Sequence, residues 1–326
     1  MCGFVGFANL KSGITKDRTI LENMNKTLAK RGPDEEGYYI DKNVALAHKR
    51  LIVIDPKGGK QPMIEKYSFG TYVIVYNGQI YNTKDLKKVL LEHNFKINTR
   101  SDTEILLKSY IYYGKDVVNH LNGIFAFAIF DSSKNEIFLA RDHFGVKPLF
   151  YTFFNDTLIF ASEIKALFEY PDIEKVLDKQ GISELFGIGP AHTPGTTIFK
   201  NIYEIKPAHF AVFNNSGLHI KRYWKLHSKE HTDSLGKTCE KLQYLLNDAI
   251  TRQLVSDMPL CTFLSGGLDS SIITKFASDY YKANNMPVLD TYSIDYVDND
   301  KNFVKSDFQP NSDNFYVDFI SKRLRN

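Results

Sequence analysis

The stretch IFAFAIFDSSKNEIFLA, residues 124–140, has the pattern of a β-hairpin. Ile124–Phe130 and Glu136–Ala140 are short apolar runs rich in Phe and Ile, and Asp131-Ser132-Ser133 between them is a typical turn sequence. Runs of the same kind occur at Thr71–Tyr76, before Asn77-Gly78, and at Thr157–Ala161. We therefore expect stacked antiparallel sheets in the first part of the chain.

Helical spacing of apolar residues predicts three helices in the same part of the chain. They span Thr19–Ala29, Thr83–Glu92 and Asp102–Tyr113. Ser101 is a candidate N-cap for the third helix, and Glu104 stands three residues further on, as in a capping box. The expected first domain is of the α+β class, with antiparallel sheets covered by helices.

The pattern changes after Trp224 to an alternation of helices and strands. After a polar stretch we expect the helix Leu235–Leu254 and the strand Leu260–Leu264. A glycine-rich turn then leads to the helix Ser270–Ala283 and the strand Thr291–Tyr296, and a long polar loop leads to the helix Asn314–Leu324. This order predicts a parallel sheet of the α/β class. Two strands are too few for a sheet covered on both faces, so we expect a truncated domain.

A length of 326 residues suits two domains, and 43% hydrophobic with 24% charged residues is typical of a globular protein. We place the first domain at 2–213, a linker at 214–234 and the second domain at 235–326.

Charge and hydropathy exclude several classes of function. The net charge is only +3 and the basic residues are dispersed, which gives no support for nucleic-acid binding. No apolar run approaches the roughly 20 residues of a membrane span, and Met1–Gly6 lacks the basic start of a secretion signal. We expect no membrane association and a cytoplasmic location.

The three cysteines, Cys2, Cys239 and Cys261, are far apart and indicate neither a disulfide framework nor a metal site. Cys261 lies in an apolar strand pattern and is expected to be a small core residue. Cys239 lies on a helix-like stretch without neighbours that would activate it. Cys2 is therefore the candidate for a catalytic cysteine.

Cys2 is followed by Gly3, which favours removal of the initiator methionine and leaves a free α-amino group on Cys2. The pKa of an α-amino group is ~7.7–8.0, so near neutral pH it can accept the thiol proton. Nucleophile and base would then belong to one residue. The alternative is that Cys2 is simply an early residue.

Asn77-Gly78 could supply two donors to an oxyanion, or could form a tight hairpin turn. Arg50, at the start of the β-run Arg50–Asp55, and Asp102 have the charges that would bind the carboxylate and ammonium of an amino-acid substrate. Each could instead form a surface ion pair, and Asp102 could serve as a first-turn helix residue.

Taken together, these residues resemble the N-terminal-nucleophile (class II) glutamine amidotransferases, and specifically the glutamine-dependent asparagine synthetases. The resemblance covers essentially the whole chain. It runs through Cys2–Gly6, Arg31–Asp34, His48–Leu51, Gln61–Met63, Asn77–Asn82, Ser101–Glu104, Asn122–Ala126, Arg141-Asp142, Phe144–Leu149 and Ala161–Lys165.

The resemblance implies an αββα first domain and a role for each candidate. Cys2 would attack the side-chain amide of glutamine, and Asn77 and Gly78 would form the oxyanion hole. Arg50 would bind the substrate carboxylate and Asp102 its ammonium. The pocket would also be lined by Leu51, Ile52, Val53, Ile54 and Gln79. Because the family usually has Glu where this chain has Gln79, we expect weaker glutamine binding but intact chemistry.

The second motif is Leu264-Ser265-Gly266-Gly267-Leu268-Asp269-Ser270-Ser271, after a predicted strand and at the start of a helix. Glycines allow close approach of an anion, and the helix N-terminus and serine hydroxyls supply donors, although the motif is not a Walker A loop. The alternative is a glycine-rich turn without a ligand.

This motif resembles the pyrophosphate loop of the ATP pyrophosphatase superfamily, so its residues are expected to bind ATP. In that family Leu264 and Ile294 would contact the adenine nucleotide, and Asp269 would lie near Mg²⁺. The family's later nucleotide and aspartate elements are absent from the sequence.

The leading hypothesis is therefore a glutamine-hydrolysing asparagine synthase with an incomplete synthetase half. Ammonia from glutamine would pass to β-aspartyl-AMP made from aspartate and ATP, with Mg²⁺, and a homodimer is a possible assembly. Alternatives are another glutamine-dependent ligase, such as a cyclising or sugar-modifying relative, or a glutaminase-only or non-catalytic form. The second motif excludes the phosphoribosyl- and fructose-phosphate-transferring relatives.

Overall fold

The computed structural model describes residues 1–14, 18–189, 191–307 and 311–324. It divides into two compact units, Met1–Ser228 and Lys229–Asn326. Within the stretch 214–234, for which we expect a linker, Gly217–Arg222 forms a strand of the first unit.

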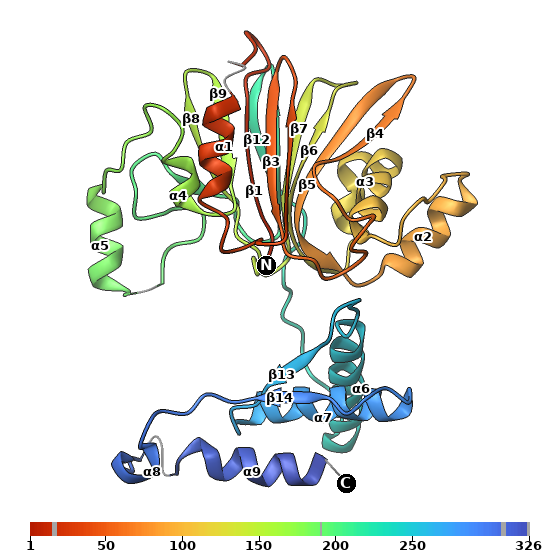
Figure 1. Cartoon of the computed structure of the whole chain (residues 1–326), viewed down its shortest axis with the longest axis vertical. Helices are drawn as coiled ribbons and strands as arrows, with labels where there is room; N and C mark the ends of the chain where they lie inside the picture. Colours follow the sequence, from red (N-terminus) through yellow and green to blue (C-terminus); the bar gives the residue numbers. More distant parts are fainter. Residues whose placement is uncertain (15–17, 190, 308–310, 325–326) are drawn as a thin grey trace. The chain divides into compact units, whose positions relative to one another are not determined.

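The first unit contains two six-stranded sheets in which neighbouring strands pair antiparallel (Figure 1). One sheet has the order β10-β8-β9-β1-β3-β2 and the other β12-β11-β7-β6-β5-β4. The strands are β1 Gly3–Ala8, β2 Glu35–Ile40, β3 Val44–Arg50, β4 Met63–Tyr67, β5 Gly70–Ile80, β6 Gly123–Asp131, β7 Glu136–Arg141, β8 Phe150–Phe154, β9 Thr157–Ala161, β10 Tyr203–Glu204, β11 His209–Asn214 and β12 Gly217–Arg222.

Helices cover the outer face of each sheet (Figure 1). Those of the first unit are α1 Arg18–Lys26, α2 Thr83–Glu92, α3 Asp102–Tyr113, α4 Ile164–Leu167 and α5 Lys179–Gly187, with the 3₁₀ helix η1 Gly114–Asn119. In β1, Phe4 packs between the sheets, whereas Val5 and Phe7 pack under α1 and α4. α2 and α3 pack on the second sheet. The expected stack of antiparallel sheets between helices is therefore confirmed.

Two local predictions for the first unit are wrong. Asn77 and Gly78 do not form a turn, because β5 continues to Ile80 and pairs with β6 throughout. Arg50 ends β3 and does not start a strand. In both cases the bounds of the strand depend on its pairing with neighbouring strands, and local residue preferences alone predict these bounds incorrectly.

The predicted N-cap of α3 is confirmed, but the capping box is not. The Ser101 hydroxyl accepts a hydrogen bond from the Thr103 N–H at 3.2 Å. Glu104 instead accepts bonds from the N–H groups of Asn98 and Thr99 and forms an ion pair with Lys108. The side chain of Glu104 thus fixes the loop before α3.

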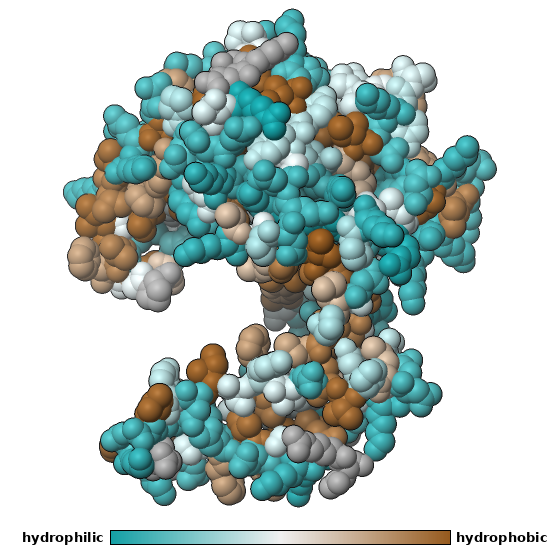
Figure 2. Space-filling view, viewed as in Figure 1, coloured by the Kyte–Doolittle hydropathy of each residue, from teal (hydrophilic) through white to brown (hydrophobic). Residues whose placement is uncertain are grey.

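In the second unit, two parallel strands are joined through a helix. Its elements are α6 Leu235–Arg252, β13 Cys261–Phe263, α7 Leu268–Ala283, β14 Asp290–Tyr292, α8 Asn299–Asn302 and α9 Asp313–Leu324. Ile294 lies beyond β14, so its predicted place on a strand is wrong. Cys261 is exposed and is not the predicted core residue, although the next residue of the strand, Thr262, contacts Thr274 of α7 at 3.0 Å. Figure 2 shows further hydrophobic side chains on the surface of this unit.

His48 joins the two sheets of the first unit. It lies on β3, fully buried, and its Nε2 is 3.0 Å from the carbonyl oxygen of Tyr76 on β5. Its Nδ1 has no partner among the described residues. Burial lowers the pKa of His48 to about 4, so the imidazole is neutral at pH 7 and donates one hydrogen bond.

We predict that this histidine makes the first unit sensitive to acid. Its pKa is lower in the folded chain than in the unfolded chain, so its contribution is complete above about pH 6.5 and is lost as the pH falls towards 4. The loss is up to roughly 3 kcal/mol. Urea unfolding can be followed by the fluorescence of Trp224, the single tryptophan. Between pH 7 and 4.5, the free energy of unfolding should fall less for His48→Gln than for the wild type. The exposed His227→Gln is the control, and equal losses in all three proteins would contradict the prediction.

Candidate active site

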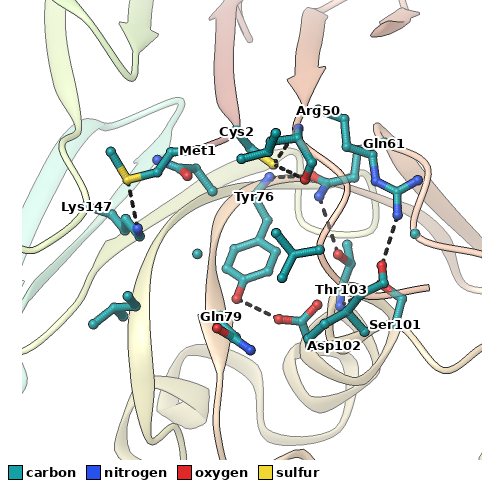
Figure 3. Close-up of a pocket in the computed structure, with 17 residues that line it drawn as sticks. Met1, Cys2, Arg50, Gln61, Tyr76, Gln79, Ser101, Asp102, Thr103 and Lys147 are labelled. Carbon is teal, nitrogen blue, oxygen red and sulfur yellow. Dashed lines mark hydrogen bonds between the residues drawn. The ribbon is translucent and has the colours of Figure 1, made fainter. Parts of the chain in front are cut away.

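A cavity of about 150 Å³ lies beside the N-terminus and receives residues from both sheets and from α3 (Figure 3). Among the predicted site residues it is lined by Cys2, Arg50, Leu51, Val53, Ile54, Asn77, Gly78, Gln79 and Asp102. Ile52 does not line it, because its N–H turns away and donates to Asp34 at 2.7 Å. Residues separated by a hundred positions in the sequence thus share one pocket.

Cys2 immediately precedes β1, and its thiol is held against the loop after β3. The Leu51 N–H lies 3.3 Å from Sγ. Burial raises the pKa of the Cys2 thiol, so the thiol needs a base to become a nucleophile. Burial also lowers the pKa of the Met1 α-amino group at the N-terminus. Removal of Met1 would place an α-amino group on Cys2, where it could act as that base.

Asn77 and Arg31 fix the backbone of Cys2. The Arg31 Nε donates to the Cys2 carbonyl at 2.9 Å, and Arg31 also pairs with Glu163. In the orientation that satisfies its neighbours, the Asn77 amide nitrogen lies 3.1 Å from the same carbonyl and its oxygen 3.3 Å from Arg31 Nη2. An amide donor is therefore present next to the nucleophile, as an oxyanion hole requires.

Gly78 lies on β5 close against the backbone of β6. A Cβ atom at this position would collide with the Ile124 carbonyl and would lie 2.7 Å from Phe125 Cα. Only glycine fits without displacing β6. The residue type at position 78 is thus set by the packing that forms this wall of the pocket.

Arg50 is buried and its guanidinium organises the loop after β3. Its Nη atoms donate to Glu35, to the carbonyls of Ile54 and Asp55 at 3.0 and 2.7 Å, and to the Pro56 carbonyl at 3.0 Å. The loop residues that line the pocket are thus held by the same side chain that was predicted to bind the substrate carboxylate.

Asp102 is a buried carboxylate without a cationic partner. Its Oδ2 accepts bonds from the Tyr76 hydroxyl at 2.9 Å and from the Ile80 N–H at 3.2 Å (Figure 3). No Lys or Arg of the described ranges forms an ion pair with Asp102, and burial raises the pKa of its carboxyl group. A negative charge that is buried in a pocket without a counter-ion is suited to a cationic ligand.

Residues that sequence reasoning did not assign also line the cavity. They are Met1, Gly59, Gln61, Tyr76, Ser101, Thr103, Ile124 and Lys147. Gln61 and Lys147 belong to motifs of the family resemblance, and Ser101 and Thr103 flank Asp102. Gly59 has no such signal: it lies against the Arg50 guanidinium, where a Cβ atom would collide.

The predicted ATP residues form a separate loop at the start of α7. Gly266 has a positive φ of 78°, and Gly267 is the N-cap without a side-chain bond to the helix. The Ser265 N–H and hydroxyl contact the Ser270 hydroxyl at 3.2 and 3.0 Å. Leu264 to Ser271 therefore lie together, and within the described residues the N-cap makes no side-chain bond to the first turn of α7, which contains Asp269. Ile294, in contrast, lies beyond β14 and is 81% exposed.

Two features are absent from the described residues. No helix there combines the length and the apolar character needed to cross a membrane. No group of three or more His, Cys, Asp or Glu side chains within those ranges is arranged to hold a metal ion.

Comparison with known proteins agrees with this geometry. The chain belongs to the glutamine amidotransferases, because the family model described as a glutamine amidotransferase domain matches residues 1–224. The model described as asparagine synthase matches residues 241–317. The resemblance to glutamine-dependent asparagine synthetases is thereby confirmed.

Individual relatives carry the same names. Asparagine synthetase [glutamine-hydrolyzing] 3 of Bacillus subtilis (strain 168) is 49% identical over 99% of this chain and 52% of its own length. Asparagine synthetase [glutamine-hydrolyzing] 2 of the same organism is 37% identical over 89% of this chain and 40% of its own length. The chain thus spans about half the length of these relatives.

Solved structures support the fold. Glutamine phosphoribosylpyrophosphate amidotransferase from B. subtilis is 19% identical with a TM-score of 0.50, over 94% of this chain and 69% of its own. The allosteric regulatory enzyme of purine biosynthesis is 18% identical with a TM-score of 0.52 over the same shares.

Proposed function

We propose that the first unit hydrolyses glutamine at Cys2 and that the ammonia serves an ATP-dependent synthesis of asparagine. The observation that carries the proposal is the pocket that brings the Cys2 thiol, the Asn77 amide and the unpaired Asp102 carboxylate together. These groups supply a nucleophile, an oxyanion donor and an ammonium ligand. The names of the relatives, which are glutamine-hydrolysing asparagine synthetases, support the same reaction.

The reaction uses the amine of the processed N-terminus as the base. After removal of Met1, the α-amino group of Cys2 takes the thiol proton, and the sulfur attacks the side-chain amide carbon of glutamine. The carbon–nitrogen bond breaks, the amine returns the proton to the leaving ammonia, and a glutamyl thioester remains on Cys2. Water then hydrolyses the thioester to glutamate.

The second unit supplies part of the ATP site in this proposal. The N–H groups at the start of α7 and the hydroxyls of Ser265, Ser270 and Ser271 would hold the pyrophosphate. Asp269, in the first turn of α7, would hold Mg²⁺ beside it. Aspartate would be activated there as β-aspartyl-AMP, which ammonia converts to asparagine.

The test is a glutaminase assay without ATP on the chain that begins at Cys2. We expect glutamate and ammonia in equal amounts, because every inferred glutamine ligand lies in the first unit. The control is the same chain with an uncleaved N-terminal extension, in which the amine is an amide and the activity should disappear. Equal activity of both forms, or none in either, would refute the proposed function.

We further predict that Gln79→Glu lowers the KM for glutamine. Gln79 lines the pocket near Asp102 (Figure 3), and a carboxylate there would add a charge-assisted bond to the substrate ammonium. The gain is at most about 1.5–3 kcal/mol. Steady-state kinetics should show the change in KM with kcat nearly constant, and the exposed Gln243→Glu should leave both constants unchanged. An unchanged or raised KM for Gln79→Glu would place residue 79 outside contact with the substrate.

A further inference from the structure

Tyr76 is a buried tyrosine whose hydroxyl has no part in the proposed reaction. It lies on β5, is 2% exposed, and belongs to the core cluster under α2 and α3. Within the described residues its hydroxyl hydrogen-bonds to Asp102 alone, at 2.9 Å from Oδ2 (Figure 3). A phenylalanine would fill the same space in the core. The bond to Asp102 is therefore what distinguishes tyrosine from phenylalanine at this position.

The backbone of Tyr76 is held on both sides of β5. Its N–H donates to Gln61 Oε1 at 2.6 Å, and its carbonyl oxygen lies 3.0 Å from His48 Nε2. Tyr76 is also paired with Phe127 of β6 in the sheet. A side chain that is locked by packing on a fixed backbone places its polar atom at one point. The hydroxyl of Tyr76 thus offers a fixed donor at the start of α3.

This donor sets the direction of the Asp102 carboxylate. Asp102 is the first residue of α3, where a carboxylate can instead turn towards the N–H groups of the helix end. The bonds from the Tyr76 hydroxyl and the Ile80 N–H both end on Oδ2, at 2.9 and 3.2 Å, and neither occupies Oδ1. The carboxylate is thereby turned towards β5, the strand that also carries Asn77 and Gln79 of the pocket.

Tyr76 acts only as a donor in this contact. Burial, and then the charge of Asp102, raise the pKa of Tyr76 well above 10, so the hydroxyl keeps its proton in the neutral range. Burial raises the pKa of Asp102, and the bonds from Ile80 and Tyr76 oppose that rise. The hydroxyl therefore favours the charged form of the carboxylate as well as its orientation.

We propose, on the basis of the glutaminase function above, that Tyr76 is a positioning residue that holds the Asp102 carboxylate against the α-ammonium of the substrate. The tyrosine thereby helps the pocket to select amides that carry an α-ammonium over amides that lack one. Tyr76 itself makes no hydrogen bond to the substrate and transfers no proton.

The test compares two amides as substrates of the chain that begins at Cys2. They are glutamine and the monoamide of glutaric acid, which is glutamine without its α-ammonium. For Tyr76→Phe, kcat/KM for glutamine should fall about 10-fold, mainly through KM, because the ammonium loses a well-placed partner. The value for the monoamide should be nearly unchanged, because this substrate has no group that needs Asp102.

Tyr110→Phe is the matched control. Tyr110 is also buried in the core cluster, but its hydroxyl bonds to Asp131 and Glu136, at 3.3 Å each, and none of these residues lines the pocket. This variant should leave the kinetics with both amides unchanged, and thermal melts show whether each variant is folded. An equal fall for both amides in Tyr76→Phe, or the same fall in Tyr110→Phe, would mean a general loss of structure and would overturn the proposal.

A second measurement does not depend on turnover. In the processed Cys2→Ala chain, isothermal titration with glutamine should give a Kd about 10-fold higher when Tyr76→Phe is added. The same addition to a chain that also carries Asp102→Asn should change the Kd much less, because the two residues act through one carboxylate. Equal changes in both backgrounds, or none in either, would overturn the role of Tyr76.

The two sets of data separate this inference from the proposed function. If the unmodified chain binds glutamine but releases no glutamate, the proposed function fails, and the titrations still decide the role of Tyr76. If the unmodified chain hydrolyses glutamine and Tyr76→Phe does so with the same KM, only the role of Tyr76 fails. A chain that neither binds nor hydrolyses glutamine would refute both.

Discussion

Cys2→Ala should abolish glutamine hydrolysis by the processed chain, with a fall in kcat of at least about 10³-fold. In the proposed mechanism the thiol sulfur attacks glutamine, and alanine leaves the amine, the Asn77 amide and the Asp102 carboxylate in place. Binding of glutamine should therefore survive, and isothermal titration should give a Kd close to the wild-type KM.

Cys239→Ala is the matched control for this loss. Cys239 is exposed on α6 in the second unit, and its replacement should leave glutaminase activity unchanged. Hydrolysis that persists in Cys2→Ala, or that disappears in Cys239→Ala, would show that the nucleophile has been assigned to the wrong residue.

Asp102→Asn should weaken glutamine binding and at the same time stabilise the protein. The amide can still accept bonds from Tyr76 and Ile80, but the charge proposed to bind the substrate ammonium is lost, so KM should rise by about 10- to 100-fold. Because Asp102 is buried without a cation, its neutralisation removes a desolvation cost and should raise the Tm of the first unit.

The acid dependence of binding follows from the same carboxylate. Burial raises the pKa of Asp102, so the side chain becomes protonated at a higher pH than an exposed aspartate. The KM for glutamine should consequently increase as the pH falls, and this increase should be absent in Asp102→Asn.

Glu104, two residues further along α3, provides the contrast. It is also buried, but despite that burial the bonds from Lys108, Thr99 and Asn98 lower its pKa. Glu104→Gln should reduce stability and leave the KM nearly unchanged. If Asp102→Asn lowers the Tm as Glu104→Gln does, Asp102 has a structural role and is not the ammonium ligand.

Local sequence signals predicted the fold where they agreed with the packing. The helices Thr83–Glu92 and Asp102–Tyr113 have the predicted bounds, because apolar spacing and the Ser101 cap act within each segment. The turn predicted at Asn77-Gly78 was wrong, because pairing with β6 extends β5 through both residues. Strand partners are distant in the sequence and are not visible in a local pattern.

The site was predictable in its chemistry and less so in its geometry. Cys2, Asn77 and Asp102 were selected through their chemistry and the family resemblance, and the structure places all three in one pocket. Ile52 was placed there in error, since the direction of a loop residue depends on contacts such as its bond to Asp34. The position of Lys147 depends on a bond that its carbonyl accepts from Arg141 and on a bond that its N–H donates to Asp142, and no spacing indicates either.

The most direct measurement is rapid acid quench of the processed chain during glutamine turnover, followed by peptide mapping by mass spectrometry. The account predicts a glutamyl thioester on the N-terminal peptide that contains Cys2, formed without ATP and absent from the chain with a blocked N-terminus. Turnover of glutamine with no adduct on Cys2 in burst-phase and steady-state samples, or with the adduct on Cys239 or Cys261, would contradict it.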